Sequence, residues 1–255
     1  TLAAEVNDAV SRGRVDELVR LVEMGAVVRR IRAHNGITPL HLAAVNGQSK
    51  MVETLIQMRA EIRSLDMDGH TALHKAALRG HTETVKVLLA RRLDPRLRGR
   101  YGYTALHLAV ENGHLETVKV LVERWPNVRT NKDDGYIALQ LAAVSGHLEM
   151  VKYLVELGVD VRARNGERLT ALHYAAREGR EESVKLLVSL GADPLAYDKH
   201  GRTASSLAAE HGYLGVVELL DNIYETIAQS QQEADAQARA EVDAHVNAQV
   251  DAQVD

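Results

Sequence analysis

The sequence of 255 residues contains no cysteine and no phenylalanine, and it has one tryptophan and four prolines. Without cysteine the chain has no disulfide, no thiolate chemistry and no zinc-finger spacing. Its longest apolar runs are far shorter than the ~20 residues that a membrane-spanning helix needs, and the first residues show no secretory signal. We therefore expect a soluble protein that is cytoplasmic (or nuclear).

The chain does contain a repeat with a period of 33 residues. Equivalent markers stand at Thr38, Thr71, Thr104, Ile137, Thr170 and Thr203. Nine residues after each marker comes a glycine, then an amphipathic run, and a second glycine precedes most markers by two positions. Glycines suit tight turns, so each unit is predicted to be a turn followed by two antiparallel helices. Such units stack on their neighbours, without one globular core that encloses a pocket.

The markers open a recurring phrase, as in Thr38-Pro39-Leu40-His41-Leu42-Ala43-Ala44. This phrase and its period resemble the ankyrin repeat over residues 2–221. The resemblance implies an all-α ankyrin-repeat solenoid of helix-turn-helix units joined by β-turn fingers. It also implies that the Thr and His of each phrase brace the turn through hydrogen bonds, while the alanine pair lets the helices approach closely.

The repeats divide the chain into four expected segments. These are an N-terminal capping repeat at 1–33, five internal repeats at 34–198, a C-terminal capping repeat with a helix extension at 199–230, and a tail at 231–255. The tail alternates Ala or Val with polar residues such as Gln and Asp. Its low complexity predicts a disordered or loosely helical segment.

Two internal repeats depart from the pattern. Ile137 and Gln140 stand where Thr and His are expected, and Arg168 replaces a turn glycine. We expect a reshaped turn around Arg168, because glycine is the residue that enters positive φ freely.

Twelve histidines raise the question of a metal or catalytic site. Seven are periodic, which indicates structural bracing, since a metal site needs side chains that converge on one point: His41, His74, His81, His107, His114, His147 and His173. We see no carboxylate placed to activate four of the remaining five: His34, His70, His200 and His211. No phosphate-binding glycine loop and no nucleophile elbow is present. We expect no enzyme activity, cofactor, metal site or small-molecule substrate.

Arginines recur just past the second helix of successive repeats, at Arg30, Arg63, Arg96, Arg129 and Arg162, with further arginines at positions 91, 92, 98 and 100. This arginine ladder suits an acidic partner or nucleic acid. Equally it suits a solvated edge that interacts with nearby acids and helix C-termini. The net charge of −4 and the lack of a nucleic-acid-binding motif favour the solvated edge.

By the resemblance, the finger tips and the exposed side of each first helix line a concave face that binds proteins. Tyr101, Tyr103 and Tyr136 fall on adjacent fingers and are typical of rigid aromatic anchors, although tyrosines can also simply cover neighbouring turns. Carried over position by position, the predicted partner-binding residues are Ile37, Met67, His70, Leu78, Arg79, Tyr101, Tyr103, Glu111, Asn112, Asp134, Tyr136, Val144, Leu169 and Arg177.

These observations predict a non-catalytic protein- or peptide-binding module that uses the concave face. Two alternatives stay open. One is an engineered or consensus-type ankyrin scaffold with no dedicated partner, because the joint absence of Cys and Phe fits a designed sequence about as well as a biased natural composition. The other is binding of an acidic partner or nucleic acid through the arginine ladder.

Overall fold

A computed structural model describes residues 1–126 and 132–251, and the all-α class predicted from the sequence is confirmed there. The chain separates into two units, 1–163 and 164–255. The first helices of the repeats are α1 (Leu2–Ser11), α3 (Pro39–Val45), α5 (Ala72–Leu78), α7 (Ala105–Glu111), α9 (Lys132–Ser145), α11 (Ala171–Arg177) and α13 (Ala204–Glu210). The second helices are α2 (Val15–Glu23), α4 (Ser49–Gln57), α6 (Thr82–Ala90), α8 (Leu115–Arg124), α10 (Leu148–Glu156), α12 (Glu181–Ser189) and α14 (Leu214–Asp251). Two short 3-10 turns are η1 (Val28–Arg30) and η2 (Arg100–Gly102).

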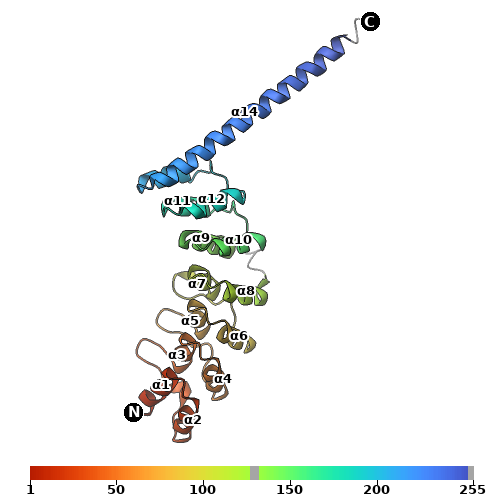
Figure 1. The fold of residues 1–255 in the computed structure, drawn as a ribbon. Coiled ribbons are helices and arrows are strands. Elements are labelled where there is room, and N and C mark those ends of the chain that lie inside the picture. The colour runs from red at the N-terminus through yellow and green to blue at the C-terminus, as the bar shows by residue number, and fades with distance from the viewer. Residues whose placement is uncertain (127–131, 252–255) are drawn as a thin grey trace. The chain divides into compact units, whose positions relative to one another are not determined.

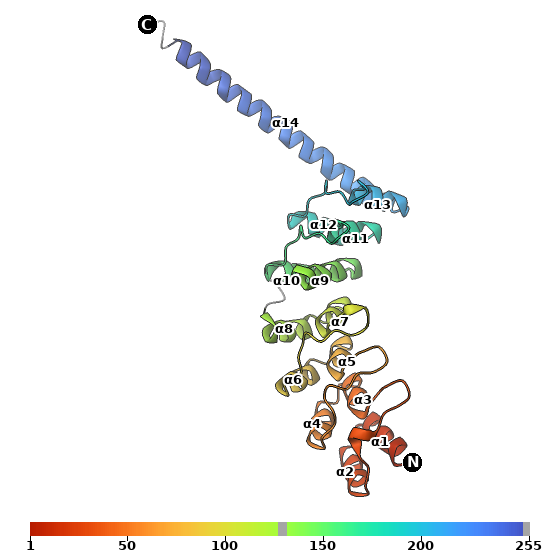
Figure 2. The same cartoon turned by 180° about the vertical axis from the view of Figure 1, so that it is seen from behind.

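Within residues 1–163 the helices form two layers (Figure 1, Figure 2). Each first helix packs on the next one from α1 to α9, and α2, α4, α6 and α8 pack in the same sequence in the second layer. Leucines two positions after each marker are 1 % exposed, namely Leu40, Leu73, Leu106 and Leu139. Burying each such side chain contributes about 1.5–3 kcal/mol, so the 33-residue register is also the register of the core.

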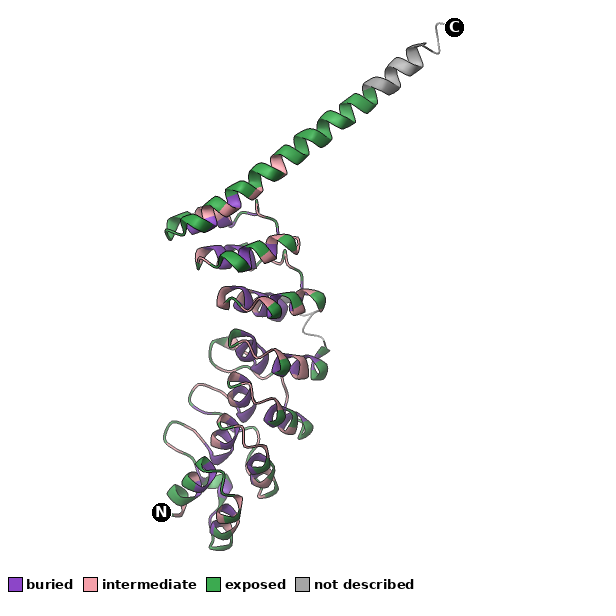
Figure 3. Cartoon of the chain, in the orientation of Figure 1, coloured by how far each residue is buried: buried purple, intermediate pink, exposed green. Residues whose placement is uncertain are grey.

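Residues 164–255 form a smaller unit in which α11 packs on α13, and both α12 and α13 contact α14. Val216 and Leu220 are buried near the start of α14, whereas every residue from 229 to 242 is exposed (Figure 3). Of the two alternatives expected for the tail, disorder is wrong and helix is correct as far as Asp251, where α14 ends. Alanine, glutamine and glutamate are strong helix formers, which explains a helix here without a packing face. No described helix combines the length and apolarity needed to cross a bilayer.

Between the repeats of residues 1–163, three finger-shaped turns precede α3, α5 and α7. Each is closed across its base by a backbone hydrogen bond: Ala33 N–H to Ile37 O at 2.8 Å, Asp66 N–H to His70 O at 3.0 Å, and Gly99 N–H to Tyr103 O at 2.8 Å. The glycine near each tip has positive φ, 71° at Gly69 for example. We call these three turns the fingers.

The fourth equivalent position has no finger. There α9 begins at Lys132, so Gly135 lies inside a helix and the turn predicted at this glycine is absent. Thr38, Thr71 and Thr104 each cap the following helix, whereas Ile137 has no side-chain acceptor. Without that cap to set a start, the helix extends toward the N-terminus.

The turn at Arg168 also differs from expectation, because it is not reshaped. Asn165 N–H bonds Leu169 O at 3.1 Å, the same closure as in the fingers, and Arg168 takes a φ of 62°. The arginine has adopted the conformation that glycine usually provides at this position.

Candidate binding site on the fingers

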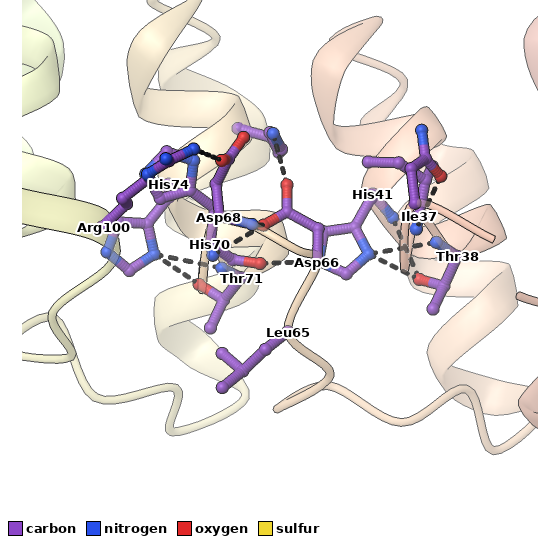
Figure 4. A network of polar contacts seen from close by, with 12 residues as sticks. Ile37, Thr38, His41, Leu65, Asp66, Asp68, His70, Thr71, His74 and Arg100 are labelled. Atoms are coloured by element: carbon purple, nitrogen blue, oxygen red, sulfur yellow. Dashed lines mark hydrogen bonds and ion pairs between the residues drawn. The ribbon is translucent and has the colours of Figure 1, made fainter. Parts of the chain in front are cut away.

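The base of each finger is held by the Thr and His of the recurring phrase. Figure 4 shows this for Thr38 with His41 and for Thr71 with His74. His74 Nδ1 accepts the Thr71 backbone N–H at 3.2 Å and lies 2.9 Å from Thr71 Oγ1. The accepting Nδ1 places the ring proton on Nε2, which donates to Leu97 O in the following loop at 3.0 Å. His41 and His107 repeat this arrangement, with Nε2 contacts to His70 O at 2.9 Å and Asp134 O at 3.1 Å. The predicted bracing is confirmed, and it also links successive repeats.

Burial keeps these histidines neutral. Desolvation, with the nearby His70 ring as the next cause, lowers the pKa of His74 to about 4. Burial likewise lowers the pKa of His41 and of His107. Both ring nitrogens are engaged in the brace, so these side chains have no free nitrogen for proton transfer.

The second periodic set of histidines follows the glycines between the two helices of each repeat. These histidines link successive repeats at the end of the first helices that is opposite to the fingers. His81 Nε2 bonds Val45 O at 2.8 Å, and His114 Nε2 bonds Leu78 O at 3.1 Å. Each ring lies over a glycine of the preceding repeat, and a Cβ on Gly47 or Gly80 would come within 2.5 Å of it. The sequence indicated the turn at these glycines, but not that a ring from the next repeat occupies the space of their missing side chains.

The fingers are also joined to one another. Met67 N–H bonds Asn35 O at 3.0 Å, and Arg100 N–H bonds Asp68 O at 2.7 Å. The side chains of Arg100 and Asp68 form an ion pair at 2.9 Å. These bonds tie each finger to the next, so the fingers form a connected surface.

Asp66 organises the middle finger from inside. Its carboxylate accepts the backbone N–H groups of Asp68 and His70 at 2.9 and 2.8 Å and pairs with Lys75. Burial acts to raise its pKa, but the hydrogen bonds from Lys75 and His70 outweigh burial and the pKa of Asp66 is lowered. Figure 4 shows this network between the first two fingers.

The expectation that His70 has no neighbouring carboxylate is wrong. Possible metal-ligand atoms of Asp66, Asp68 and His70 lie within 4.8 Å of one another. However, the Asp66 carboxylate already binds Lys75 and two amides, and Asp68 pairs with Arg100. The cluster is accounted for by the structure of the finger.

A hollow of about 410 Å³ lies between the second and third fingers and α7. It brings together four of the predicted binding residues, His70, Tyr101, Tyr103 and Glu111, with three residues outside that list, Asp68, Arg100 and Leu108. Their shared signal in the sequence is position, since all seven lie on adjacent fingers or on the first helix behind them.

Two tyrosines define this hollow. Tyr101 is 81 % exposed and has a φ of 62°, unusual for a non-glycine residue, with the Arg100 guanidinium 5.3 Å from its ring. Tyr103 is half-buried and its ring is tilted against the His107 ring at 5.7 Å. One ring therefore projects from a finger tip and the other rests on the brace.

Other predicted residues do not line the hollow. Met67 is 76 % exposed at the middle finger, and Ile37 is half-buried at the first. Arg79 and Asn112 are exposed C-caps of α5 and α7. Leu78 is half-buried and, as noted, its carbonyl accepts from His114.

The placement predicted for Tyr136 and Asp134 at a finger is wrong. Both lie in α9, where Tyr136 is 8 % and Asp134 0 % exposed. Arg98 Nη2 reaches both oxygens of the Asp134 carboxylate, at 2.9 and 3.1 Å. Val144 is half-buried in the same helix. The missing cap at Ile137 turns a finger position into a core position.

Leu169 and Arg177 belong to the unit of residues 164–255. Leu169 is half-buried, and its N–H bonds the Asn165 side chain at 2.9 Å. Arg177 pairs with Glu178 at 3.1 Å and lies 4.8 Å from the Tyr174 ring. A contact that the sequence did not suggest lies in the same unit, where Arg168 lies 4.7 Å from the exposed ring of Tyr197.

The arginines of the ladder fall into two groups in the structure, those that are exposed and those that pair with an aspartate. Arg30 and Arg63 are exposed, while Arg96 pairs with Asp94 at 3.0 Å. Arg98 and Arg100 point to Asp134 and Asp68. Arg129 lies outside the described residues, and the side chain of Arg162 is exposed.

Comparison with known proteins agrees with this geometry. The family model described as "Ankyrin repeats (3 copies)" matches residues 6–99, 40–132, 93–165, 124–198 and 158–229. The ankyrin repeat domain of human ASB11 is 27 % identical, with a TM-score of 0.70 over 84 % of this chain and 96 % of that one. The ankyrin repeat domain of Bcl-3, described as a unique member of the IkappaB protein family, is 30 % identical, with a TM-score of 0.67 over 84 % and 97 %. A comparison with curated protein sequences gave no match.

Proposed function

The chain belongs to the ankyrin repeat family, whose members act in general as protein–protein interaction modules, and on that premise we propose that it is a non-catalytic binder that recognises a protein or peptide with its concave face. The part of that face which carries recognition is the hollow between the second and third fingers. The observation that supports this most is Tyr101, an aromatic side chain held 81 % exposed at a finger tip.

The backbone at Tyr101 supports a binding role. A left-handed conformation costs a non-glycine residue of order 1 kcal/mol, and Gly102 beside it also has positive φ, 76°. Because the ring is exposed, burial within this chain does not offset that cost. A partner that covers the ring would supply the missing burial, which is how tyrosine anchors act in interfaces.

The hollow is also organised before any partner arrives. The His70 ring stacks on His74 at 5.2 Å, Tyr103 rests on His107, and the Asp68–Arg100 pair joins the two fingers. A preformed site loses less conformational entropy on binding than a flexible one. Leu108 supplies an apolar surface and Glu111 an exposed carboxylate, a mixture typical of the centre and rim of protein interfaces.

An affinity capture from cell lysate tests the proposal when the parent is compared with a Tyr101→Ser/Glu111→Gln variant. Both side chains are exposed, so we expect the variant to fold as stably as the parent. A matched control, Glu83→Gln/Lys86→Gln, changes an exposed ion pair on α6 in the other layer. The proposal predicts a protein retained by the parent and the control but lost by the hollow variant.

Two results would contradict it. A protein retained equally by all three chains would place binding elsewhere, and loss with the α6 control alone would place it on the second helices. If repeated captures from several cell types retain nothing on the parent, the alternative of a scaffold without a dedicated partner is favoured.

A further inference from the structure

The loops that follow the second helices of residues 1–163 carry a second surface, away from the hollow. Six arginines in three successive loops are exposed, and none forms an ion pair with a described residue. We call them the basic edge: Arg29, Arg30, Arg59, Arg63, Arg91 and Arg92. They contrast with Arg98 and Arg100, whose guanidinium groups are engaged by Asp134 and Asp68.

Two of these arginines have a left-handed backbone conformation, which glycine adopts more readily than any other residue. Arg59 and Arg92 follow the C-caps of α4 and α6 with φ values of 63° and 62°. The equivalent position after α2, α10 and α12 is a glycine in each case, with φ between 92° and 102°: Gly25, Gly158 and Gly191. An L-residue in this region costs about 1–2 kcal/mol relative to its preferred conformations, whereas glycine enters it freely.

Neither guanidinium group forms a hydrogen bond or an ion pair with a described residue, and the backbone bond at the helix end is one that glycine also makes. Arg59 N–H bonds Ile56 O at 3.0 Å, and Gly158 N–H makes the same bond to Val155 O at 2.9 Å. The helix end is therefore closed equally well by both residue types. A strained residue with an exposed, unpaired side chain indicates a role outside the fold.

The three loops lie side by side, so the arginines form one surface. Arg32 bonds Leu65 O and Ser64 Oγ at 3.1 and 3.2 Å, which joins the first loop to the second. The second and third loops are close enough to interact electrostatically. The pKa of Asp94 is lowered mainly by its hydrogen bond from Arg96, and Arg63 on the preceding loop adds to the effect.

We propose that the basic edge binds an acidic segment of a protein partner through its aspartate and glutamate carboxylates. Guanidinium groups match carboxylates in a two-bond geometry, and one exposed pair contributes little, so several loops have to act together. This surface is independent of the hollow between the fingers, and either can exist without the other.

Carboxylates fit this edge better than a nucleic acid does. Glu61 and Asp94 stand among the arginines and interrupt the continuous positive potential that a phosphate backbone favours. The loop residues 24–32, 58–65 and 90–97 contain no aromatic side chain on which bases could stack.

The test uses a fluorescent octaglutamate peptide as the probe, with binding measured by anisotropy at low ionic strength, where exposed charge pairs are least screened. The decisive variant is Arg59→Gly/Arg92→Gly. We expect its affinity for the probe to fall at least about fivefold, while its urea midpoint stays unchanged or rises, because the strain at both positions is relieved.

The matched control is Lys86→Gln/Lys119→Gln, which removes the same charge from the solvent-facing sides of α6 and α8. It is expected to change probe affinity less than twofold. The proposal is overturned if the glycine variant unfolds more easily, if the control loses as much affinity, or if the parent does not bind the probe. Tighter binding of a 16-base-pair DNA duplex than of octaglutamate at the same salt would overturn the choice of an acidic protein segment.

Discussion

The finger before α7 and the first turns of α9 occupy equivalent positions of the 33-residue period, yet one is a turn and the other is a helix. Thr104 and His107 brace the finger, whereas Ile137 and Gln140 offer no such brace. Leu106 and Leu139, two positions after the markers, are equally buried. Two polar residues thus decide whether a repeat presents a finger, while the apolar register alone maintains the core.

The two repeats also place an equivalent tyrosine differently. Tyr103 and Tyr136 stand one repeat apart, but Tyr103 lines the hollow and Tyr136 lies 8 % exposed in α9. The same residue type at the same register position therefore lines the proposed recognition site in one repeat and packs in the core in the next.

The largest losses of stability are expected from truncating the buried leucine of each repeat, because both leucines belong to one core. Leu106→Ala and Leu139→Ala each remove a side chain that is 1 % exposed, so each should lower the free energy of unfolding by about 2–5 kcal/mol. Urea titration measures this, with Leu214→Ala, at a position 73 % exposed, as a control near zero. A small effect of Leu139→Ala beside a large effect of Leu106→Ala would mean that α9 does not hold the repeat register.

The braced repeats should also be sensitive to acid. The folded-state pKa of His74 is about 4, below the ~6.5 of an unfolded chain. Between these values the unfolded chain binds the extra proton, so stability is full above about pH 6.5 and falls as the pH drops toward 4. For His74 alone the loss is about 3 kcal/mol.

Urea titrations at pH 7, 5.5 and 4.5 measure this dependence. His74→Gln imitates the side chain found at Gln140, and its stability should depend less on pH over that range than that of the parent. An unchanged pH dependence would show that the buried histidine is not responsible for the acid sensitivity.

A smaller effect is expected from the cap itself. Thr104→Ala removes the acceptor that starts α7 and should lower the free energy of unfolding by about 1 kcal/mol. Hydrogen exchange should speed up at the finger amides of Gly102 and Tyr103 and stay unchanged in α4. Thr54→Ala, inside α4 and away from any finger, serves as the control, and equal exchange at Gly102 in both variants would contradict the role of the cap.

Most of the fold could be predicted from the sequence, because the spacing of Leu, Ala and Gly directly reports helix faces and turns. The missing finger could not be placed, although Ile137 and Gln140 were visible departures, since the start of a helix depends on a balance of about 1 kcal/mol between capping and extension. Arg168 shows the opposite outcome, because its neighbours impose a glycine conformation on an arginine. For the tail the sequence left disorder and a loose helix both open, because alternating residues give no packing face, and the alanine content agrees with the helix that forms.

The candidate site was predictable in location but not in composition. Tyr101, Tyr103, His70 and Glu111 were found by position along the period, whereas the pairing of Arg100 with Asp68 depends on how neighbouring fingers align. Burial of Tyr136 followed from the same missing cap.

A single pair of variants, Tyr103→Ala and Tyr136→Ala, measured for both stability and affinity toward a captured partner, separates recognition from packing. We predict that Tyr103→Ala weakens partner binding at least about tenfold, as expected for an anchor, with less than about 1 kcal/mol lost in stability. Tyr136→Ala should lose about 3 kcal/mol of stability and keep its affinity per folded molecule. If Tyr136→Ala instead abolishes binding while Tyr103→Ala leaves it intact, the fingers are not the recognition surface.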